Sequence, residues 1–134
     1  MIGRPGLKKR AAWPSGIGVR ALIVDDSRAM RTILRRLCIE SGYTDVTEAP
    51  DVNSARVAAV DGRPDIVVVD WKLPDGMGID LVRCLRAEGE TAAMVVLAPS
   101  AEQGAAEAAA QAGASDCVAK PFTGDDLRRL AAAA

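Results

Sequence analysis

Five short apolar runs alternate along this 134-residue chain with longer segments whose apolar residues recur at helical spacing. A parallel sheet whose strands are joined by crossover helices produces this alternation. The runs cover residues 19–24, 45–49, 66–69, 94–97 and 116–120. The expected helices follow them, one between Ser27 and Gly42 and the others at residues 51–60, 79–87, 101–112 and 125–130. The pattern predicts an α/β fold, a doubly wound (βα)5 domain with a five-stranded parallel sheet in the order 2-1-3-4-5.

Charged side chains stand where three of the expected strands end. The first run stops at Asp25 and Asp26, the third stops at Asp70, and the fifth ends in Lys120. Parallel strands point their carboxyl ends to one edge of a sheet, and ligands bind there between strands one and three, where the strand order reverses. We therefore expect these four side chains to meet at that edge.

Three carboxylates brought together repel one another, which raises at least one pKa unless a cation lies among them. Oxygen ligands, in a chain that contains no histidine, favour a hard divalent ion such as Mg²⁺. Asp70 is then placed to accept a phosphoryl group, with Lys120 as a second cation that offsets the charge on the transferring oxygens.

The composition restricts the function classes. Seventeen basic and 18 acidic residues give a net charge of -1, which favours neither nucleic acid nor an anionic membrane, and no apolar run is long enough to span a bilayer. Cys38, Cys84 and Cys117 are odd in number and have no histidine beside them, which indicates a reducing, cytoplasmic compartment rather than a disulfide framework or a zinc site. Residues 1–18 are basic and lack a secretory apolar run, so we expect a flexible lead-in before a domain at residues 19–134.

Three motifs together resemble the response regulator receiver domain of two-component signalling, most closely the stand-alone chemotaxis kind. They are Val24-Asp25-Asp26-Ser27, the segment 70–78 and Lys120-Pro121-Phe122. The resemblance covers residues 19–130 and implies a flavodoxin-like fold. It also implies a histidine kinase or histidine phosphotransferase as phosphoryl donor, an output protein of unknown identity, and a monomer or weak dimer. No output domain is expected after Leu130, and no catalysis beyond the domain's own phosphorylation and dephosphorylation.

The resemblance assigns roles to individual residues. It implies that Asp70 is the phosphoacceptor and that Asp26 and Asp70 bind Mg²⁺ directly, with Asp25 binding directly or through water. The backbone carbonyl of Lys72 would be a further ligand, and Lys120 would contact the phosphoryl group. The Lys72 side chain would either attract phosphate or pair with Asp70, and the sequence leaves both open.

The chain departs from the family pattern at the switch. Counting back from Lys120 places Ala98 where the family has a hydroxyl residue, and counting forward from Asp70 reaches Ser100 instead. We prefer Ala98 because the run 94–97 ends directly before it. Cys117 replaces the aromatic residue that commonly moves with the switch.

Two functions remain open at this point. The leading one is a phosphoacceptor with an atypical switch, in which Pro99 crowds the water that hydrolyses the acyl phosphate. The alternative is a degenerate receiver that acts as a phosphorylation-independent protein-interaction module.

Arg28, Arg31 and Arg35 form a stripe on the first expected helix, which we interpret as a solvated face or a partner contact.

Overall fold

The computed structural model describes residues 19–99, 104–120, 123 and 125–126. The expected lead-in at residues 1–18, the candidate Ser100 and most of the expected last helix lie outside the described residues. Among those described, no helix is both long and apolar enough to cross a bilayer.

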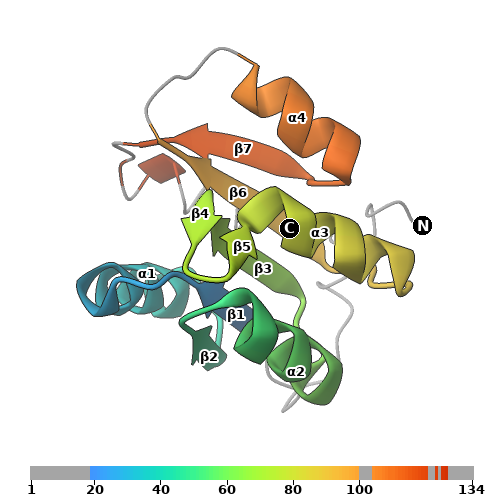
Figure 1. Cartoon of the computed structure of the whole chain (residues 1–134). Coiled ribbons are helices and arrows are strands. Elements are labelled where there is room, and N and C mark those ends of the chain that lie inside the picture. The colour runs from blue at the N-terminus through green and yellow to red at the C-terminus, as the bar shows by residue number, and fades with distance from the viewer. Residues whose placement is uncertain (1–18, 100–103, 121–122, 124, 127–134) are drawn as a thin grey trace.

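Five parallel strands form one sheet in the order β2-β1-β3-β6-β7 (Figure 1). Its strands are β1 (Arg20–Val24), β2 (Asp45–Ala49), β3 (Ile66–Asp70), β6 (Ala93–Ala98) and β7 (Asp116–Ala119). The helices are α1 (Arg28–Glu40), α2 (Val52–Gly62), α3 (Gly78–Ala87) and α4 (Ala105–Ala112). Counted along the chain, these five strands have the predicted order 2-1-3-4-5, and the doubly wound flavodoxin-like fold is confirmed.

Helices cover both faces of the sheet. Alternate strand residues such as Ile23 and Val68 point to one face, where they pack with Leu34 and Cys38 of α1. The intervening strand residues pack on the other face against α2, α3 and α4. β3 is buried from Ile66 to Val69, as expected of a central strand built from β-branched residues.

Local signals in the sequence explain where the helices begin and end. The Ser27 side chain caps α1 by accepting a hydrogen bond from the Met30 backbone N–H at 3.2 Å. Gly113 ends α4 in the left-handed region, at φ 108°. At helical spacing Ile33 shares a face with Met30, Leu34 and Leu37, which predicts that it packs against the sheet. It is 50% exposed, so that prediction is wrong.

A second small sheet follows β3. Its two strands, β4 (Lys72–Leu73) and β5 (Gly76–Met77), pair antiparallel around a turn at Pro74 and Asp75. The sequence predicts only a loop here. The hairpin carries the chain from the end of β3 to the start of α3.

Candidate functional site

Three carboxylates gather at the carboxyl edge of the central strands. Asp25 and Asp26 follow β1 directly, and Asp70 is the last residue of β3. β1 and β3 pair in parallel with Val24 opposite Val69, so the next residue of each strand arrives at the same level. One carboxylate oxygen from each aspartate lies within 4.8 Å of the others.

Lys120 reaches this cluster from the end of β7, the edge strand on the other side of β6 from β3. Its backbone N–H donates to the Ala98 carbonyl at 2.8 Å, which holds the chain against β6 just beyond the end of β7. Its Nζ donates to Asp70 Oδ1 at 2.8 Å, and the Trp71 backbone N–H donates to the same oxygen at 2.8 Å. The structure therefore brings the three aspartates and the lysine together.

Asp25 is 1% exposed and its polar atoms are held at three points. Its N–H donates to the Ala49 carbonyl at 3.1 Å, its Oδ1 accepts from the Ser27 N–H at 2.8 Å, and its carbonyl accepts from Arg31 Nη1 at 2.7 Å. The remaining atom, Oδ2, is buried and has no hydrogen-bond partner among the described residues. A buried carboxylate oxygen without a partner is costly.

The electrostatics of Asp25 fit a cation. Burial is the largest cause that raises the pKa of this carboxyl above its ordinary value of 3.8, and the negative charges of Asp70 and Asp26 raise it further. The Ser27 N–H and the Lys120 ammonium act in the opposite direction. Clustered oxygen ligands, one of them unsatisfied, are the donor set that Mg²⁺ takes.

The other predicted site residues lie around this cluster. Lys72 begins β4 two residues beyond Asp70, and it is exposed. Ala98 is the last residue of β6 and is 1% exposed; its neighbour on β6, Leu97, is paired with Asp70. Ala98 therefore offers only a methyl group beside the end of β3. Cys117, on β7, is partly buried and packs against the core that α2, α3 and α4 cover.

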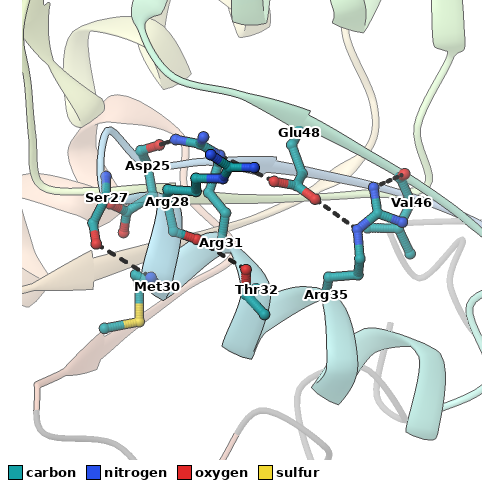
Figure 2. A network of polar contacts seen from close by, with 9 residues as sticks. All are labelled: Asp25, Ser27, Arg28, Met30, Arg31, Thr32, Arg35, Val46 and Glu48. Carbon is teal, nitrogen blue, oxygen red and sulfur yellow. Dashed lines mark hydrogen bonds and ion pairs between the residues drawn. The ribbon is translucent and has the colours of Figure 1, made fainter.

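The sequence does not indicate the network of polar contacts that joins Asp25, α1 and β2 (Figure 2). Arg31 Nε and Arg35 Nε donate to the two oxygens of Glu48 on β2 at 3.0 and 2.6 Å. These contacts lower the pKa of Glu48, Arg35 more strongly than Arg31. The interpretation as a solvated face is wrong for Arg31, whose side chain is 16% exposed, whereas Arg35 shares the same carboxylate but is 41% exposed. The alternative, a partner contact, stays a prediction. A partial signal for this network is present in the sequence. Arg31 and Arg35 are four residues apart on one helix, and Glu48 lies on the strand that follows it.

A second contact that the sequence does not reveal joins the hairpin to α2. The Asp75 carboxylate accepts from the backbone N–H groups of Val52 and Asn53, at 2.7 and 3.0 Å. Asp51 caps the same helix from within, accepting from the Ser54 N–H at 2.8 Å. The first turn of α2 thus depends on the turn that follows the phosphoacceptor candidate.

Gly78 allows α3 to approach the site. Its N–H donates to the Trp71 carbonyl at 2.8 Å, and a Cβ at this position would collide with the Asp70 carbonyl oxygen. Only a residue without a side chain permits this close approach.

Comparison with known proteins identifies the family. The model of the response regulator receiver domain matches residues 21–132. The chain is 38% identical over 112 residues to the chemotaxis protein CheY of Pseudomonas aeruginosa, covering 82% of this chain and 90% of that protein. It is also 38% identical over 112 residues to the chemotaxis protein CheY-3 of Vibrio cholerae, with 82% and 86% covered.

Solved structures agree on the fold. The receiver domain of a Francisella response regulator superposes with a TM-score of 0.78 at 25% identity, covering 84% of this chain and 93% of that one. The chemotaxis protein CheY4 of Vibrio cholerae superposes with a TM-score of 0.78 at 23% identity, covering 85% and 96%. The chain belongs to the response regulator receiver domain family, a signalling module of two-component systems.

Proposed function

We propose that the chain accepts a phosphoryl group on Asp70 from the phosphohistidine of a histidine kinase or histidine phosphotransferase, in a Mg²⁺-dependent phosphorelay. The observation that carries this proposal is the grouping of Asp25, Asp26 and Asp70 with Lys120, whose Nζ lies 2.8 Å from Asp70 Oδ1. Such a set supplies a nucleophile, a cation site and a fixed ammonium at one edge of the sheet.

The division of labour follows from the contacts. An oxygen of Asp70 attacks phosphorus as the bond to the donor nitrogen breaks, and the donor imidazole leaves with that electron pair. Asp25, Asp26 and Asp70, with the Lys72 carbonyl, would hold Mg²⁺, which when bound supplies positive charge to the phosphoryl oxygens. Lys120 exchanges its ion pair with the Asp70 carboxylate for contact with a phosphoryl oxygen.

The output step differs from the usual one. Ala98 has no hydroxyl to donate to a phosphoryl oxygen, and Cys117 has no aromatic ring to move with it. With Ala98 at the switch, phosphorylation would reach an output protein by another route, such as the hairpin after Asp70, whereas Ser100, the alternative at this position, would keep a hydroxyl donor. We place the transfer of the phosphoryl group from the donor histidine to Asp70 in the cytoplasm, where histidine kinases present their phosphohistidine.

Ala98, Pro99 and Cys117 favour a second candidate, a degenerate receiver that binds its partner without phosphorylation. The complete acidic set opposes it, because a pure interaction module has no use for a buried carboxylate oxygen that finds no partner among residues 19–99, 104–120, 123 and 125–126.

Acetyl phosphate, a small phosphoryl donor, separates the two candidates. With MgCl₂ present, we expect the intact protein to gain one phosphoryl group by mass spectrometry. Asp70→Asn and chelation of the metal should each abolish the gain. Either no gain in the native protein or a gain that persists in Asp70→Asn would contradict the proposal, and no gain at all would leave the interaction module.

A further inference from the structure

Arg31 connects three elements around the acidic turn (Figure 2). It lies on α1, its Nη1 donates to the Asp25 carbonyl at 2.7 Å, and its Nε donates to Glu48 Oε1 on β2 at 3.0 Å. The side chain is 16% exposed, which is low for an arginine. A planar guanidinium that fills both contacts at once has little freedom to move.

Arg35 provides an internal comparison one turn further along α1. It binds the other oxygen of Glu48 at 2.6 Å and donates through Nη2 to the Val46 carbonyl at 2.9 Å. It has the same charge and the same carboxylate partner as Arg31, but its contacts point along β2 rather than to Asp25. The two arginines therefore differ in the one contact that matters for the acidic turn.

We propose that Arg31 is a positioning residue for the metal site, an inference that rests on the proposed function. The carbonyl it holds belongs to the peptide unit that links Asp25 to Asp26. Because that unit is planar, fixing its oxygen also fixes the direction of the N–H and the Cα of Asp26. Together with the Ser27 N–H on Asp25 Oδ1, this contact aims both carboxylates at the cation.

The direction in which Mg²⁺ affinity changes when Arg31 is removed distinguishes a positioning role from a purely electrostatic one. A guanidinium near the acidic cluster repels a divalent cation, so an Arg31 that acted only as a charge would weaken Mg²⁺ binding, and its removal would strengthen it. Glu48 offsets much of that charge at 3.0 Å. If Arg31 positions the ligands, its removal weakens binding instead.

The experiment titrates MgCl₂ into the full chain and measures the fluorescence of Trp71, whose backbone N–H donates to Asp70 Oδ1. A Trp13→Phe background leaves Trp71 as the sole tryptophan, since the chain has two. The Mg²⁺-induced rise in the thermal unfolding midpoint gives an independent measurement. We expect Arg31→Met to raise the dissociation constant about tenfold or more. The matched control Arg35→Met should stay within about twofold of the native value.

Two further variants keep the inference testable if Arg31→Met does not fold. Arg31→Lys keeps the charge but lacks the fork that reaches both partners, so it should also weaken binding. Glu48→Gln loosens the anchor of Nε and should weaken binding by less. Native or tighter binding in the Arg31 variants, or equal losses for Arg31 and Arg35, overturns the inference. If the native protein responds to Mg²⁺ in neither measurement, the proposed function itself fails.

Discussion

Lys120 and Asp70 are 50 residues apart in sequence, yet their side chains form an ion pair with Nζ 2.8 Å from Oδ1. The pair is partly shielded, since the side chains are 30% and 14% exposed. Asp70 is thus paired with a cation of the chain itself. That pairing predicts how the site responds when the lysine is removed.

Replacing Lys120 by Met should slow phosphorylation by acetyl phosphate about a hundredfold at saturating MgCl₂, because one charged donor to the transferring oxygens is lost. Lys120→Arg, which keeps the charge, should lose less. Mg²⁺ affinity should not fall, since removing a cation makes the cluster more negative. The time course of the mass change measures the rate, and an unchanged rate in Lys120→Met would count against the role of this residue.

Gly78→Ala should lower the free energy of unfolding by about 1–3 kcal/mol, because the new Cβ meets the Asp70 carbonyl oxygen and forces the backbone apart. Gly62→Ala is the matched control, since a Cβ there meets nothing within 4 Å. That change should be neutral or stabilise α2 by up to about 1 kcal/mol. Urea denaturation measures both, and equal effects would show that Gly78 is not required by close approach.

The pH dependence of stability should change when Glu48 is replaced by Gln. Arg35 and Arg31 lower the pKa of Glu48 in the folded state, so its contribution is fully present above the ordinary value of 4.5. It is lost as the pH falls through the lower folded-state value. Native protein should therefore lose more stability between neutral pH and acid than Glu48→Gln does. Thermal unfolding midpoints measured across that range, with Asp61→Asn as a control on α2, test this; parallel curves for native protein and Glu48→Gln would contradict it.

Cys84 and Cys38 should react at very different rates with a thiol reagent at mildly alkaline pH. Cys84 is exposed, whereas burial raises the pKa of the Cys38 thiol to about 11. Since the thiolate is the reactive form, Cys84 should be modified in the folded protein and Cys38 only after unfolding. Peptide mapping after short labelling identifies the site, and Cys84→Ser should remove the fast phase. Rapid labelling of Cys38 in the native state would be inconsistent with its burial.

Pro99 directly follows Ala98 and is exposed beside the end of β6. If its ring crowds the water that attacks the acyl phosphate, Pro99→Ala should dephosphorylate faster than the native protein. The decay of the phosphorylated mass after removal of acetyl phosphate measures this. Equal decay rates would remove the idea.

The sequence predicted the sheet order and the residues at its edge because both depend on short patterns. Four β-branched residues from Ile66 to Val69 identify the central strand, and the acid after it marks where the strand ends. Parallel pairing then places Asp70 beside the end of β1 without knowledge of any loop. The topology alone therefore brings these acids to one edge.

The arginine network could not be predicted in the same way. Whether Arg31 reaches Glu48 depends on how α1 packs across β2, and helix periodicity does not give that angle. The same limit applies to Ile33, which the pattern assigns to the packed face although half of it is exposed. Cysteine behaves as a small apolar residue, which predicts a position in or near the core for Cys84, but it is exposed on α3.

The Asp75 carboxylate couples the β4–β5 hairpin to the start of α2 through two hydrogen bonds. Both of its oxygens accept hydrogen bonds from backbone N–H groups of α2, so the turn cannot shift away without breaking these two bonds. Strain introduced at Asp70 would therefore appear as fraying at Val52 and Asn53, the first two residues of α2. Faster amide hydrogen exchange at Val52 and Asn53 after phosphorylation would show that the hairpin transmits the change at Asp70 to α2.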